Sequence, residues 1–146
     1  PYSLIAQTYG GVGEYGKGSQ YAEQALELDP SNPRLHGLLG RMYYHNNEFD
    51  KSLPEFELAT RGGKIVGGEV TGLPLEPGVV AEYYYTYGLA LVKLERCSLA
   101  RPIFDLILAS LTEDQDGIAV FNAQEGLRQC RELEAAQATP VVTPTP

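Results

Sequence analysis

The sequence predicts an all-α protein built as a stack of helical repeats, and three observations agree on this. Similar residues recur 34 positions apart, as Tyr9 does with Tyr43 and Ala25 with Ala59. Within the copies, apolar residues return every three or four positions, as on one face of an α-helix. Turn-forming residues divide each copy into two such segments. A helix pair of this size cannot bury its apolar face alone, so successive pairs are expected to stack.

The first two copies are adjacent, over residues 1–32 and 33–61, and each is predicted to contain two helices. In the second copy an apolar stripe runs from Leu35 to Tyr43 on one helix face. Asn32 before Pro33 is a favourable helix start. The Asn side chain can accept from a free amide of the first turn, and Pro fits the first helical position.

The third copy, over residues 79–111, keeps the order of residue types at a larger offset. Gly40 and Gly88 are 48 positions apart, and so are Phe56 and Phe104. Because this offset exceeds the 34-residue period, an insertion of 14 residues is expected between the second and third copies.

Residues 62–78 are rich in glycine and proline, so this insert is predicted to be non-helical. The β-prone segments 64–66 and 69–71 flank Gly67-Gly68, a pattern typical of a small β-hairpin. Two further interpretations stay open: a surface loop that the fold simply tolerates, and a flap that contacts a partner. A phosphate-binding loop is disfavoured because no Gly-Lys-Ser/Thr follows the glycines.

A last helix without a partner helix is predicted over residues 113–137. Thr112 and Gln115 have the spacing of a capping box, in which each side chain bonds a backbone amide of the other residue. The far end of this helix is polar, which suits a segment that caps the open end of a stack. Residues 138–146 are rich in Thr and Pro and are predicted to form an extended tail or linker. The helical repeat domain would therefore cover residues 1–137.

These copies resemble the tetratricopeptide repeat (TPR) family, whose units are helix-turn-helix pairs of 34 residues. Ala6, Gly40 and Gly88 stand where that family needs close approach of helices, and Ala25-Leu26-Glu27-Leu28-Asp29-Pro30 is similar to its second-helix ending. The resemblance implies a right-handed superhelical stack of about three pairs plus a capping helix. It also implies that the first helices line a concave face, where partners bind as peptides or helices.

The composition argues against several functional classes. Eleven Lys and Arg against nineteen Asp and Glu give a formal net charge of −8, the wrong sign for binding nucleic acid or anionic lipid. No apolar run approaches the roughly 18 residues of a membrane-spanning helix. His36 and His45 would lie about 13 Å apart on one helix, too far to share a metal ion, and are expected at the surface or in the groove. With no nucleophile and base in view, we expect no enzyme, no cofactor and no metal.

Two cysteines, Cys97 and Cys130, leave two alternatives. The default expectation is a pair of buried free thiols. A disulfide between them is the alternative, since both residues could lie at the same end of adjacent helices. The Thr/Pro-rich tail weakly favours a location outside the cytoplasm, with the cytoplasm as the alternative.

By the register of that family, the concave face would be lined by residues from copies two and three: Arg34, Arg41, Tyr44, His45, Tyr85, Leu89, Val92 and Lys93. Arginines can hold a carboxylate through paired hydrogen bonds, and tyrosines supply stiff contact area. The expected ligand is a peptide with an acidic group near the arginines and an apolar side chain near Leu89 and Val92. In the alternative interpretation, both arginines are solvated or pair with Glu residues of neighbouring copies.

The leading prediction is therefore a non-catalytic protein–protein interaction module that binds a peptide or protein segment. Self-association into a homodimer is the second hypothesis, because apolar residues occupy more than one stripe of the last helix; among them are Ile118, Val120, Phe121, Leu127 and Cys130. The third is scaffolding or regulation within a longer parent protein.

Overall fold

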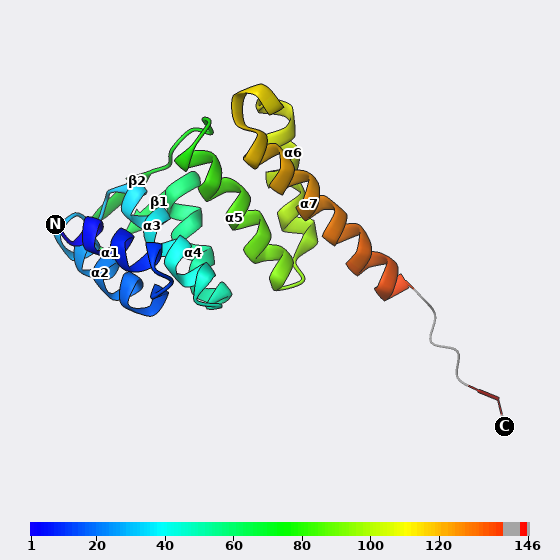
Figure 1. Ribbon diagram of the computed structural model, residues 1–146, viewed down its shortest axis with the longest axis horizontal. Helices are drawn as coiled ribbons and strands as arrows, with labels where there is room; N and C mark the ends of the chain where they lie inside the picture. Colours follow the sequence, from blue (N-terminus) through cyan, green and yellow to red (C-terminus); the bar gives the residue numbers. More distant parts are fainter. Residues whose placement is uncertain (139–143, 146) are drawn as a thin grey trace.

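The computed structural model describes residues 1–138, 144 and 145, and it confirms the predicted helical stack with a short antiparallel hairpin (Figure 1). The elements in chain order are α1 (Tyr2–Gly11), α2 (Tyr15–Leu28), α3 (Pro33–His45), α4 (Phe49–Thr60), β1 (Gly62–Ile65), β2 (Gly68–Thr71), α5 (Val79–Lys93), α6 (Cys97–Ser110) and α7 (Glu113–Ala138). Three helix pairs follow one another along the stack, and α7 packs on the last pair.

Two predicted helix starts are present with their hydrogen bonds. The Asn32 side chain accepts from the Arg34 amide at 3.0 Å, directly before Pro33 begins α3. At the start of α7, the Gln115 side chain accepts from the Thr112 amide at 2.9 Å, and the Thr112 hydroxyl accepts from the Gln115 amide at 3.3 Å. This is the reciprocal pattern of a capping box, so local sequence sets both starts.

Equivalent glycines sit at equivalent helix crossings in consecutive pairs. A Cβ added to Gly40 would lie 2.9 Å from the Phe56 ring, and one added to Gly88 would lie 2.5 Å from the Phe104 ring. Each glycine thus lets the following helix place a fully buried phenylalanine directly against the backbone. The repeats are in register, as the 48-residue spacing predicts.

The insert is a β-hairpin, but its turn lies one residue earlier than predicted. Ile65 pairs with Gly68, so the two-residue turn is Val66-Gly67 and not Gly67-Gly68. Gly67 takes φ 80°, which suits glycine, and this register buries Val70. The insert is fastened to the stack, because the Leu73 amide donates to the Ala59 carbonyl at 2.8 Å and the Tyr84 hydroxyl donates to the Leu73 carbonyl at 2.6 Å.

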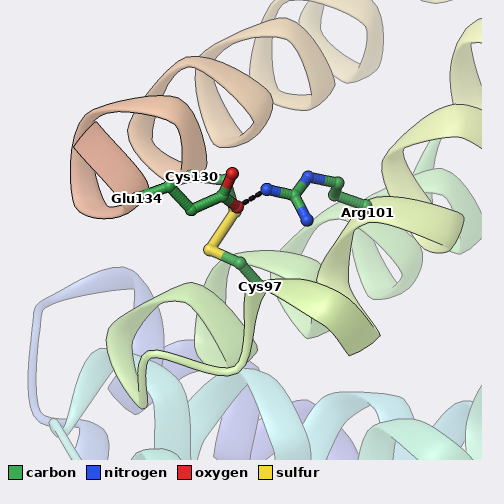
Figure 2. Close-up of a disulfide and its surroundings, with 4 residues drawn as sticks. All are labelled: Cys97, Arg101, Cys130 and Glu134. Carbon is green, nitrogen blue, oxygen red and sulfur yellow. Dashed lines mark ion pairs between the residues drawn. A yellow bond between two sulfur atoms is a disulfide. The ribbon is translucent and has the colours of Figure 1, made fainter. Parts of the chain in front are cut away.

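The expectation of free thiols is wrong: Cys97 and Cys130 form a disulfide (Figure 2). Helices α6 and α7 run antiparallel, so the start of α6 meets the later part of α7, and the two Cα atoms lie 5.7 Å apart. Arg101 and Glu134, one turn further along each helix, form an ion pair beside the bond. The capping helix is thus held covalently to the last pair.

The division into a repeat domain over 1–137 and a tail over 138–146 stays a prediction. Helix α7 ends at Ala138, and most of the proposed Thr/Pro tail lies outside the described residues. Within the part of the chain that is described, no helix is both long and apolar enough to cross a bilayer.

Candidate functional site

The first helix of each pair contributes to one continuous face. Helix α1 contacts α3, α3 contacts α5, and α5 contacts α7. This row, which we call the inner face, holds the residues that the sequence predicts to line a groove. The hydrogen bonds and ion pairs of these residues decide what the face can bind.

Both predicted groove arginines are already paired with glutamates. Arg41 forms an ion pair with Glu82 of α5, and both side chains are largely buried. Arg34 lies 3.5 Å from the Glu76 carboxylate of the insert, and this pair is exposed. The structure therefore matches the alternative in which the arginines pair with carboxylates of neighbouring segments. The acidic ligand stays a prediction, and these ion pairs do not favour it because they offset the charge that would attract it.

Tyr44 and His45 are placed by aromatic contacts at the end of α3. Tyr44 is half-buried, with its ring edge-on to Phe49 at 5.3 Å between centroids. His45 stacks on Tyr15 of α2 at 5.0 Å. Burial, and then the nearby Arg41 charge, lower the pKa of His45 below its usual value, so the ring is neutral at pH 7. His45 offers rigid area near α1, whereas Tyr44 packs against the core cluster around Phe56, and neither ring carries a fixed charge.

The four predicted residues of α5 divide into surface and core. Tyr85 and Leu89 are half-buried, and Lys93 is exposed at the end of the helix. Val92 is only 5% exposed, so it belongs to the core and offers a ligand little area. Val92 and Lys93 both line a depression of about 450 Å³ between α5 and the later part of α7, and neither Arg34 nor Leu89 is among its walls.

Two small depressions flank the Arg41–Glu82 ion pair on the inner face. One, of about 230 Å³, lies between α1 and α3, with Gln7, Gly10, Tyr15 and His45 among its walls. The other, of about 270 Å³, lies between the start of α5 and α7; its walls are Gly78, Val79, Glu82, Tyr85, Asp116 and Ile118.

Asp116 shapes the second depression, and the sequence does not predict its role as a helix cap. The residue leaves helical geometry inside α7, with φ −160° and ψ 83°. One carboxylate oxygen accepts from the Ala119 amide at 3.1 Å, and the other accepts from the Gly78 amide at 2.8 Å. Asp116 therefore caps the longer part of α7 and ties the end of the insert to it. An Asp three residues before Ala119 has the spacing of a helix cap. The capping box at Thr112, however, already predicts a helix start just before it.

His36 is buried, so the expectation of a surface or groove histidine is wrong for this residue. Each of its ring nitrogens lies close to one hydrogen-bond acceptor: Nδ1 lies 2.6 Å from the Glu55 carboxylate, and Nε2 lies 2.8 Å from the Pro30 carbonyl. Both acceptors receive a hydrogen bond when both ring nitrogens carry protons, which is the charged form of the ring. Burial lowers the pKa of His36, but the bonds to Glu55 and Pro30 outweigh it, and the pKa is raised above its usual 6.5. His36 thus joins α3, α4 and the preceding turn.

Comparison with known proteins identifies the first helix pair. A profile of the tetratricopeptide repeat family matches residues 1–32, which contain α1 and α2. Residues 1–32 are therefore similar to a tetratricopeptide repeat. The following TPR-like pairs continue the same stack, with Gly40 and Gly88 at corresponding crossings. Repeats of this family generally mediate protein–protein interaction and are generally non-enzymatic. No curated protein matches the sequence.

Proposed function

We propose that this chain is a non-catalytic module that binds a segment of a partner protein on the inner face. The observation that carries the proposal is the pair of depressions on either side of the Arg41–Glu82 ion pair. Half-buried tyrosines border this region, and tyrosine supplies rigid, amphipathic area typical of binding hot spots. An extended segment could place one side chain in each depression. Among the described residues, no cluster of His, Cys, Asp and Glu is arranged to hold a metal ion.

We also propose that residues 1–137 act as one binding domain and that the tail connects this domain to other segments. Disulfides persist in oxidising compartments, so the Cys97–Cys130 bond favours a location outside the cytoplasm.

Peptide selection tests this function. Dodecamer peptides selected from a random library on the immobilised chain would be labelled, and their affinity measured by fluorescence polarisation. Tyr85→Ala on the inner face is expected to weaken the selected peptides at least tenfold, because it removes rigid contact area. Leu99→Ala is the matched control, since Leu99 is exposed on α6, outside the inner face. Equal affinity for both variants, or a loss confined to Leu99→Ala, would contradict the proposal.

Self-association is the second candidate, and exposed apolar side chains of α7 favour it. Ile118 and Phe121 are 68% and 64% exposed, although their neighbours Ala119 and Val120 are buried. Exposed apolar residues that gather on one helix suit a contact between copies. Sedimentation equilibrium separates the candidates: a dimer that the double variant Ile118→Ser/Phe121→Ser abolishes would support self-association.

A further inference from the structure

We propose that the depression between the start of α5 and α7 binds a cationic side chain, lysine or arginine, of the partner segment. The inference rests on the proposed function, because it names the chemistry of one part of that partner. We call this depression the α5–α7 pocket; it encloses about 270 Å³. Its lining combines apolar walls, a tyrosine and two carboxylates.

The apolar walls of the pocket are exposed to solvent. Val79 is 55% exposed, and Ile118 faces it from α7 with a still larger exposed fraction. The half-buried Tyr85 ring completes the apolar part. Lysine and arginine carry three or four methylene groups that cover such surface while the charged end reaches polar atoms. An aromatic ring nearby adds favourable contact for a cation.

The two carboxylates of the pocket retain capacity to accept hydrogen bonds. Glu82 uses one oxygen for Arg41, and among the described residues its other oxygen accepts only from the Tyr85 hydroxyl, at 3.5 Å. Each oxygen of Asp116 accepts from one backbone amide. Since a carboxylate oxygen can accept two hydrogen bonds, both groups can receive the N–H donors of a ligand without losing those they hold.

The electrostatic field at Tyr85 points to the same ligand charge. Burial, followed by the charges of Glu82 and Asp116, raises the pKa of Tyr85 to about 12, and the opposing effect of Arg41 is smaller. The part of this pKa shift that comes from Glu82 and Asp116 reflects a negative potential, which also stabilises a cation at this place. Glu113 and Asp114 at the start of α7 extend this potential, and the net charge of −8 favours encounter with basic segments.

A titration with small probes tests the charge requirement directly. The whole chain, labelled with ¹⁵N, would be titrated with N-acetyl-arginine methylamide and with N-acetyl-citrulline methylamide, which has nearly the same shape without the charge. The arginine probe is expected to give saturable shifts at the amides of Val79, Tyr85 and Ile118, with a Kd of roughly 1–10 mM. The citrulline probe is expected to bind at least fivefold more weakly. Equal binding of the two probes, or shifts that do not saturate, would overturn the inference.

Matched variants then locate the site. Asp116→Asn removes one negative charge and keeps one oxygen that can cap α7, although it loses the acceptor of the Gly78 amide. Glu113→Gln removes the same charge from an exposed position outside the pocket lining. Asp116→Asn should weaken the arginine probe at least threefold, whereas Glu113→Gln should change it less than 1.5-fold. Ile118→Ser, at an exposed position, leaves the charge of the chain unchanged. It should also weaken binding of the arginine probe. Equal losses for Asp116→Asn and Glu113→Gln would show nonspecific attraction and refute the site.

The two proposals fail in different ways. Selected peptides that bind the inner face but show no preference for lysine or arginine would refute the cationic pocket and leave the proposed function standing. A saturable arginine probe, together with selected peptides that ignore Tyr85→Ala, would refute the proposed function and support the pocket alone.

Discussion

Loss of the Cys97–Cys130 disulfide is expected to lower the free energy of unfolding by about 3–4 kcal/mol. The cysteines are 33 residues apart in sequence, and the loop-closure relation for a crosslink of this length gives about 3.7 kcal/mol at 25 °C. Small domains have total stabilities of roughly 5–15 kcal/mol, so the bond would supply a large share. The double variant Cys97→Ala/Cys130→Ala should reproduce the loss and add a small cavity term, because Cys130 is fully buried.

Urea denaturation of the oxidised chain, the reduced chain and the double alanine variant measures this effect. The reductant should change the midpoint of the oxidised chain and leave that of the variant unchanged, which controls for effects of the reductant itself. Hydrogen exchange locates the loss: protection should fall most in α7, where Ala119, Val120 and Ala123 pack into the core. A change below 1 kcal/mol on reduction, or an equal loss of protection in α3 and α7, would refute the reasoning.

Two further predictions concern packing and pH. Gly88→Ala should lower the unfolding free energy by about 1–3 kcal/mol, because the added Cβ would lie 2.5 Å from the Phe104 ring. Gly117→Ala is the control, since a Cβ added there would have nothing within 4 Å. Urea denaturation should show that this control is nearly neutral. The raised pKa of His36 predicts a stabilisation that is complete below pH 6.5 and is lost as the pH rises through the folded pKa. His36→Gln should remove this dependence in denaturation curves between pH 5 and 9, and a wild-type stability that instead rises over that range would contradict the assigned partners.

The stacking of the helices was predictable because it depends on short-range patterns that the sequence repeats. A small residue at Gly40 or Gly88 and an aromatic ring 16 positions later are both visible in one chain, and their recurrence fixes which helices cross closely. Helix starts at Asn32 and Thr112 follow from capping chemistry within three residues. The hairpin was predictable as an element, but its turn was misplaced by one residue.

The side-chain partners of the inner face were less predictable, because they join different helices. Whether Arg41 faces solvent or Glu82 depends on the rotation and offset between α3 and α5, which repeat spacing alone does not give. The same holds for His36, whose acceptors come from α4 and from the turn before α3. Val92 was assigned to the face by helical register, yet the nearby α7 helps to bury it. Contacts between elements therefore limit what sequence reasoning can say about the site.

The sizes of the buried side chains differ along the stack, and this difference indicates which part of the inner face is preorganised. Helices α1 and α2 bury only small residues, whereas α3 supplies Leu38, Leu39 and Met42 to the same cluster. The larger cluster, around Phe56 and Phe104, extends through α7 and carries the disulfide. Repeat arrays open from their weaker end, so α1–α2 should be the first pair to lose hydrogen-exchange protection. A site on the rigid end loses less conformational entropy when it binds. This is a second reason, besides charge, to expect the anchoring side chain of a partner in the α5–α7 pocket, with its remaining residues adapting along α3 and α1.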